Sequence, residues 1–193
     1  GFSPGLFLDQ RQNRLWVKEQ ARGLRVLNLF SYTAGFSLCA AVGGAREVVS
    51  VDSSKSTIEW AKGNFALNGM KEEDRIEFWV ADARYFLRGC VNRNRRFDLV
   101  ICDPPSFSRG REGIFRVEDD LGSLVKQVLL ALEPGGRALV STNFEGWDQA
   151  EFEGVVAAIA GDAEMLATPL AGWDFELPGI ERLLKALVLQ KAG

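Results

Sequence analysis

Short apolar segments alternate with helix-like segments along this 193-residue chain, and this alternation restricts the fold more than any other feature of the sequence. Alternation of this kind is typical of a parallel sheet wrapped by helices. We therefore predict an α/β fold with a mostly parallel, doubly wound sheet. The strand-like segments lie at residues 24–30, 47–51, 75–80, 97–102, 137–142, 163–167 and 183–190.

The length suits one domain with a short arm. Residues 1–23 are expected to form the arm, with a helix over residues 9–21, and residues 24–193 the domain itself. Hydrophobic residues make up 47% of the chain, enough for a sizeable core. No apolar run approaches the ~20 residues that span a bilayer, so we expect no membrane association. Because the chain opens on Gly1 rather than on methionine, we expect a further domain upstream.

Residue types that are rare or missing narrow the chemistry. The chain has no histidine, which removes the commonest general base and the commonest metal ligand, and no metal is expected. Cys39, Cys90 and Cys102 are odd in number and widely spaced, which favours the reducing cytoplasm. The net charge of −3 gives no overall attraction to nucleic acid, but residues 84–116 hold eight arginines against three acids. This local excess is either an RNA contact or a solvated basic face.

A stiff loop follows the apolar run at residues 97–102. It begins with Asp103-Pro104-Pro105-Ser106-Phe107, at the place where open α/β sheets hold their active sites. The prolines fix φ and remove two backbone donors. We expect Asp103 and Phe107 to lie beside a flat, hydrogen-bonding substrate such as a nucleobase, although an ordinary turn is the alternative. Residues 106–117 are expected to form a polar loop long enough to be a lid.

Polar residues also end the first three strands. They are residues 28–33, Asp52 and Asp82. Asp52 follows the first turn by about 20 residues and can accept hydrogen bonds from a ribose diol, while Asp82 is placed for an adenine edge. Gly35 lets the backbone pass close to a ligand. Each acid could instead cap the helix that follows it.

The first turn decides between nucleotide ligands. Dinucleotide enzymes need Gly-x-Gly-x-x-Gly, because a pyrophosphate rests on the helix N-terminus. Residues 28–35 hold a single glycine together with the bulky Phe30 and Tyr32. The turn therefore favours a ligand with no phosphate and a compact amino-acid tail, such as S-adenosylmethionine.

Five motifs together resemble the class I S-adenosylmethionine-dependent methyltransferases that modify large-subunit ribosomal RNA. The resemblance covers nearly the whole chain. It implies a Rossmann-like fold whose seven-stranded sheet has an antiparallel last strand, and it implies ribosomal RNA as the partner, with a homodimer left open. The motifs are Gly5-Leu6-Phe7-Leu8-Asp9-Gln10-Arg11, residues 27–35, Val51-Asp52-Ser53-Ser54, Asn64-x-x-x-Asn68-Gly69 and Asp103-Pro104-Pro105-Ser106-Phe107-Ser108.

Two branches of this family differ after the fifth strand. The 5-methylcytosine branch carries a cysteine there, as its chemistry needs a thiolate, whereas here Asn143 and Phe144 follow the strand. The chain is more similar to the guanine-N7 branch of the bifunctional K/L type. Cys102 is expected to point into the core. An exocyclic amine as target, a small-molecule or protein substrate, and an inactive cofactor-binding scaffold remain alternatives.

The resemblance implies a role for each site residue. Asp103, Pro104 and Pro105 would lie at the methyl-transfer point, with Phe107 as a stacking ring or a buried anchor of the lid. The expected cofactor contacts are Phe30, Ser31, Thr33, Gly35, Asp52, Ser53, Asp82 and Ala83. The expected substrate contacts are Asp9, Gln10, Arg11, Ser106, Arg109 and Asn143.

Overall fold

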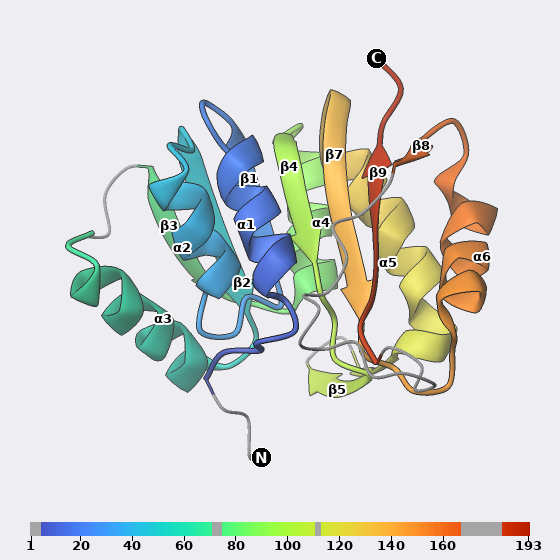
Figure 1. Ribbon diagram of the computed structural model, residues 1–193, viewed down its shortest axis with the longest axis horizontal. Coiled ribbons are helices and arrows are strands. Elements are labelled where there is room, and N and C mark those ends of the chain that lie inside the picture. Colours follow the sequence, from blue (N-terminus) through green and yellow to red (C-terminus); the bar gives the residue numbers. More distant parts are fainter. Residues whose placement is uncertain (1–4, 71–74, 111–112, 167–182) are drawn as a thin grey trace.

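The computed structural model describes residues 5–70, 75–110, 113–166 and 183–193, which form a seven-stranded sheet, a separate two-stranded hairpin and six helices (Figure 1). The strands are β1 (Arg25–Leu29), β2 (Glu47–Asp52), β3 (Ile76–Val80), β4 (Phe97–Cys102), β5 (Phe107–Gly110), β6 (Gly113–Arg116), β7 (Leu132–Thr142), β8 (Glu164–Leu166) and β9 (Lys185–Gln190). The helices are α1 (Arg11–Gln20), α2 (Gly35–Val42), α3 (Lys55–Leu67), α4 (Ala83–Asn92), α5 (Val117–Ala131) and α6 (Gln149–Ala160).

The strand order β3-β2-β1-β4-β7-β9-β8 confirms the predicted doubly wound sheet. Neighbours from β3 to β7 run parallel, and β9 lies antiparallel between β7 and β8. The chain builds outward from β1 to β3 and then returns to place β4 on the other side of β1. Ligands of open α/β sheets bind at such a reversal, outside the carboxyl ends of the strands.

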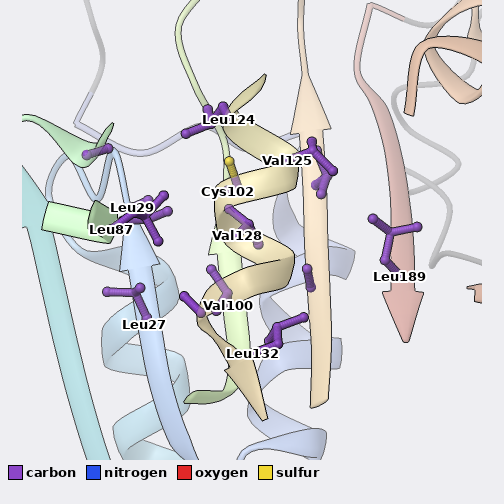
Figure 2. Packing of buried hydrophobic residues seen from close by; sticks show 14 of the residues in the cluster. Leu27, Leu29, Leu87, Val100, Cys102, Leu124, Val125, Val128, Leu132 and Leu189 are labelled. Atoms are coloured by element: carbon purple, nitrogen blue, oxygen red, sulfur yellow. The ribbon is translucent and has the colours of Figure 1, made fainter. Parts of the chain in front are cut away.

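The inner strands β1, β2, β4, β7 and β9 bury residues on both faces, so the sheet has a core on either side. Leu27, Val100 and Cys102 share one buried cluster with Leu124 and Val128 of α5, and Figure 2 shows Val100 and Cys102 of β4 close to that helix. Residues on the opposite face pack against α1, α2 and α3. Cys102 is fully buried, as predicted. In the described part of the chain, no helix has the length and apolar character to cross a membrane.

The segment predicted as a lid loop is a β-hairpin in the described residues. β5 and β6 pair antiparallel, with Ser108 opposite Phe115. Phe115 is 1% exposed and joins the main core, so the hairpin is anchored on one face. The apolar Phe115 alternates with exposed neighbours, a pattern typical of a half-buried strand, and the prediction of a loop overlooked this pattern. Residues 111 and 112 lie outside the described residues. β7 also begins earlier than predicted, at Leu132, with a register shift opposite Phe97 and Leu99.

A buried polar cluster joins β1, β2 and α2 below the first turn. Asn28 Nδ2 donates to Ser37 Oγ at 2.9 Å, and Ser50 Oγ lies 2.7 Å from the same atom. The three residues are at most 1% exposed. Buried polar groups of this kind need each other, because no water can replace a lost partner. The cluster therefore fixes the start of α2 relative to the ends of two strands.

We predict that Ser37→Ala lowers the free energy of unfolding by about 1–3 kcal/mol, because Asn28 and Ser50 lose their shared partner. Urea unfolding followed by circular dichroism measures the change. Ser123→Ala is the matched control, since Ser123 is exposed in α5 and its hydroxyl donates to Asp120 O in its own helix. The control should change stability by less than about 0.5 kcal/mol. Equal urea midpoints for Ser37→Ala and the parent would contradict the role of the cluster.

Candidate functional site

A cavity of about 540 Å³ opens at the carboxyl edge of the sheet, where the strand order reverses. This volume lies within the range of about 300–1,000 Å³ that small-molecule sites occupy. Asp52, Asp82 and Asp103 all line it, so the acids that end β2, β3 and β4 converge as the sequence predicted. Every other predicted site residue except Arg11 lines it as well: Phe30, Ser31, Thr33, Gly35, Ser53, Ala83, Pro104, Pro105, Phe107, Asp9, Gln10, Ser106, Arg109 and Asn143.

The turn from β1 into α2 has an uncommon backbone conformation. Phe30, Tyr32 and Ala34 have φ values of 53°, 48° and 63°, in the left-handed region that costs a non-glycine residue about 1–2 kcal/mol. Three such residues in alternate positions coil the turn tightly against the cavity. Strain of this size is found where a binding site requires it.

Neighbouring elements hold the strained turn in place. Tyr32 N donates to Asp52 Oδ2 at 3.0 Å, and Asn64 Nδ2 of α3 donates to Thr33 O at 2.9 Å. Ser31 N donates to Val51 O at 3.0 Å. The motif residue Asn64 therefore supports the turn from outside the cavity.

The N-terminal arm forms one wall of the cavity and is tied to the same turn. Tyr32 Oη accepts a hydrogen bond from Gly5 N at 3.1 Å, and Thr33 Oγ1 donates to Gly5 O at 2.5 Å. A Cβ at Gly35 would lie 3.0 Å from Leu6 Cδ1, so this glycine leaves room for the arm. Arg11 lies outside the lining, whereas Arg14, one turn further on, lines the cavity and donates to the arm at Phe7 O. No pattern in the sequence indicated Arg14.

Asp52 and Asp82 combine local hydrogen bonds with exposure to the cavity. Asp52 Oδ1 accepts from Ser54 N at 2.9 Å. Asp82 caps α4 by accepting from Arg84 N at 2.9 Å, and its other oxygen lies 3.3 Å from the guanidinium of Arg84. Helix capping, the alternative reading of Asp82, is thus present together with a position in the cavity wall. Because a carboxylate offers about four acceptor sites, both acids retain capacity for a ligand.

Asp103 is held from behind by a chain of hydrogen bonds. Ser141 Oγ at the end of β7 donates to Asp103 Oδ1 at 2.7 Å, and Gln10 Nε2 donates to Ser141 Oγ at 3.0 Å. Asn13 Nδ2 donates to Gln10 Oε1 at 2.6 Å. Gln10 is only 3% exposed, so its amide acts chiefly on the support of Asp103.

Burial changes the ionisation of Asp103. Desolvation raises the pKa of its carboxyl group from 3.8 to about 6, and the nearby charge of Asp9 adds to the rise. The hydrogen bonds from Ser141 and Gln10 oppose the rise in pKa. The carboxyl group is therefore mostly ionised at pH 7 and takes up a proton in mildly acidic solution. A perturbed carboxyl group in a cleft is a sign of a functional site.

The opposite rim of the cavity comes from the loop after β4. Ser106 Oγ lies 3.4 Å from Asn143 Oδ1, which links this loop to the end of β7. The ring of Phe107 is 45% exposed, so Phe107 is a rim residue rather than a buried anchor. Desolvation raises the pKa of the Cys102 thiol, which lies in the core directly behind the loop. A reactive thiolate at Cys102 is therefore excluded by its position.

Comparison with known proteins identifies the family. A family model for S-adenosylmethionine-dependent methyltransferases matches residues 2–152. The chain belongs to this family. The match confirms the predicted methyltransferase fold and S-adenosylmethionine as the cofactor of this methyltransferase.

Curated relatives of the methyltransferase are much longer proteins. It is 44% identical over 148 residues to ribosomal RNA large subunit methyltransferase K/L of Alcanivorax borkumensis, an alignment covering 76% of this chain and 20% of that protein. It is 45% identical over 141 residues to the K/L protein of a Shewanella species, covering 72% of this chain and 19% of that protein. The chain thus spans about a fifth of the length of these relatives.

Solved structures give the same family and fold. SMU.776, crystallised in complex with SAH, superposes with a TM-score of 0.92 at 32% identity, covering 98% of this chain and 51% of that chain. The S-adenosylmethionine-dependent methyltransferase from Agrobacterium tumefaciens gives a TM-score of 0.78 at 29% identity, covering 97% and 63% of the two chains.

The cavity of the methyltransferase has an unsatisfied polar atom that fits its cofactor. Ser31 is 6% exposed and lines the cavity, and its Oγ has no hydrogen-bond partner among the described residues. An unpaired buried hydroxyl is costly, and a polar ligand group placed against it removes that cost. The amino and carboxylate groups of S-adenosylmethionine are of the polar kind that can pair with such a hydroxyl. The residues present therefore fit the cofactor.

We predict that Asp103→Asn stabilises the protein above pH 6. In the parent, the folded-state pKa of about 6 exceeds the ordinary value of 3.8, so unfolding releases a proton between these values and stability falls as pH rises through this window. Asparagine keeps the acceptor for Ser141 but cannot ionise. We expect a gain of about 1–2 kcal/mol at pH 8 that disappears towards pH 4.

Thermal unfolding of the two proteins at several pH values measures this difference. Asp162→Asn is the control, because Asp162 is exposed in the loop after α6 and lies outside the cavity lining. A stability difference that does not depend on pH would contradict the placement of Asp103 in a desolvated position.

Proposed function

We propose that this methyltransferase modifies a base of large-subunit ribosomal RNA and that N7 of guanine is the target atom. The curated relatives are named as ribosomal RNA large subunit methyltransferases, which supports the class of substrate. Because the chain spans about a fifth of their length, the activity of the whole protein is part of the proposal. We further propose that residues 24–193 are the catalytic domain and that residues 1–23 close its cavity.

The proposal for guanine N7 rests on the residues at the acceptor side of the cavity, which is the part beside Asp103 where the methyl group would be received. Asp103 lies there between two strands, flanked by Pro104, and the chain has no histidine that could remove a proton. Methylation of cytosine C5 needs a thiolate, and Cys102 is buried behind the loop. Guanine N7 carries a free lone pair, so no proton has to leave before transfer. A site that only orients and screens its substrate is sufficient for this acceptor.

The cofactor supplies, when bound, an electrophilic methyl group on a sulfonium. We assign Asp52 with Ser53 to its ribose, Asp82 with Ala83 to its adenine, and the strained turn from Phe30 to Gly35 to its methionine end. All of the named residues line the same cavity at one edge of the sheet, which supports the assignment. In this arrangement the cofactor would lie across the cavity with its methyl group towards Asp103.

Asp103 is assigned to the base. Transfer to N7 places positive charge on the purine ring as the N–C bond forms and the C–S bond breaks. An ionised carboxylate in a partly desolvated site stabilises that charge more than water does. Pro104 restricts the backbone of Asp103, and the hydrogen bond from Ser141 orients its carboxylate.

We predict that Asp52→Asn weakens the binding of S-adenosylmethionine by about 10- to 100-fold, because one charged acceptor for the ribose diol is lost. Asparagine preserves the size of the side chain and one oxygen for the turn. Isothermal titration calorimetry measures the affinity, with Asp162→Asn as the control. An unchanged affinity for Asp52→Asn would remove Asp52 from the cofactor site.

We predict that Asp103→Ala abolishes methyl transfer while cofactor affinity stays within about tenfold of the parent. The assay uses radiolabelled S-adenosylmethionine and unmodified large-subunit ribosomal RNA transcribed in vitro. Nucleoside mass spectrometry of the product should show 7-methylguanosine. Detection of 5-methylcytidine or of an exocyclic methylamine would overturn the choice of atom, and transfer only to protein or small molecules would overturn the choice of RNA.

A further inference from the structure

We propose that the outward face of the β5–β6 hairpin is a second nucleotide subsite, which holds an unpaired RNA nucleotide next to the target base. This inference rests on the proposed function, because it concerns the same RNA substrate. The face is formed by Phe107, Arg109, Ile114 and Arg116.

The register of the hairpin places these four side chains together. Phe107 pairs with Arg116 and Arg109 pairs with Ile114, and side chains two residues apart on a strand share one face. The opposite face carries Phe115, which is 1% exposed, and the centres of the Phe115 and Phe30 rings lie 5.9 Å apart. Because Phe115 anchors the hairpin in the core, the outward face is a fixed surface rather than a loose loop. Figure 1 shows β5 at the edge where β4 ends.

The chemistry of the face suits a nucleotide. Phe107 is 45% and Ile114 49% exposed, so two apolar side chains stand in solvent next to each other. The guanidinium carbons of Arg109 and Arg116 lie 5.8 Å and 5.3 Å from the centre of the Phe107 ring. Neither guanidinium is paired with a carboxylate in the part of the chain that the structure describes. Unpaired bases stack on aromatic rings and on guanidinium planes, and guanidinium groups also bind the adjoining phosphates.

The face continues directly from the cavity. Phe107 and Arg109 line the cavity, whereas Ile114 and Arg116 lie beyond it. An RNA strand whose target base enters the cavity therefore leads its neighbouring nucleotide across Phe107 towards Arg116. Stacking of this kind requires a base outside a duplex, so the substrate is single-stranded at this point. Because the net charge of the chain is −3, attraction of a polyanion depends on local positive charge, which Arg109 and Arg116 supply here.

The charge and shape of the face favour RNA over an acidic protein segment as its ligand. Both would meet the arginines, but only a nucleotide supplies a flat π-face for Phe107 together with an anionic phosphate. The test therefore compares single-stranded RNA with poly-glutamate.

The experiment measures binding of a short fluorescein-labelled oligoribonucleotide by anisotropy, with the full chain saturated with SAH. The variants are Phe107→Leu, Ile114→Ser and Arg116→Gln, and the control is Arg22→Gln, an exposed arginine outside the cavity lining and away from the hairpin. Phe107→Leu should weaken binding by at least about fivefold, the loss expected for one stacked base. Arg116→Gln should weaken binding and reduce the slope of log affinity against log salt by about 0.7.

Four further readouts make the outcome decisive. Ile114→Ser and Arg116→Gln should leave the affinity for S-adenosylmethionine and the thermal midpoint unchanged, because neither residue lines the cavity. The same sequence annealed to its complement should bind equally to the parent and to Phe107→Leu. Poly-glutamate should displace the RNA far less well than unlabelled RNA of equal charge.

The subsite is overturned if the hairpin variants bind single-stranded RNA as the parent and Arg22→Gln do, if the parent binds no RNA, or if poly-glutamate competes as well as RNA. These results are distinct from failure of the proposed function. Methyl transfer to ribosomal RNA with unchanged binding by the variants removes only the subsite. Hairpin-dependent RNA binding without methyl transfer removes only the proposed function.

Discussion

The carboxylate of Asp103 draws three separate parts of the chain together. It follows β4, accepts a hydrogen bond from Ser141 at the end of β7, and is backed through Ser141 by Gln10 of the N-terminal arm. Desolvation raises the pKa of this carboxyl group to about 6. At pH 7 the group is therefore ionised, although the folded protein favours its neutral form more than water does. Sites of this kind give up some stability for function. This arrangement joins the arm to the ends of both strands beside the cavity.

The turn after β1 shows the same exchange of stability for shape. Phe30, Tyr32 and Ala34 adopt a backbone that favours glycine, and hydrogen bonds from Asn64 and to Asp52 hold the turn in that form. The side chain of Tyr32 then anchors Gly5, so one strained segment shapes the cofactor side and also fastens the wall above it. A loop with several glycines would adopt this backbone with less strain, but it would lack the Tyr32 anchor.

Much of the architecture could be predicted because its signals are local. Apolar strands that end in acids, and helices that end near glycine or proline, placed the sheet and located its carboxyl edge. Contacts between distant parts of the chain had no such signal: Gln10 and Ser141 are 131 residues apart, and no spacing indicates that they meet. The position of Arg14 in the cavity wall could not be predicted for the same reason. The hairpin was predicted as a loop because its strands are four residues each and rich in glycine and arginine.

The anchored arm also determines how this domain can be joined to others. Gly5 is bound to the turn beside the cavity, while the last strand leads Lys191 to the opposite edge, where Lys191 O accepts from Gly135 N at 3.2 Å (Figure 1). A polypeptide fused ahead of Gly5 is therefore delivered to the substrate side of the molecule. One fused after Gly193 emerges on the far side and leaves the opening clear, which makes the C-terminus the better position for an affinity tag or a surface tether.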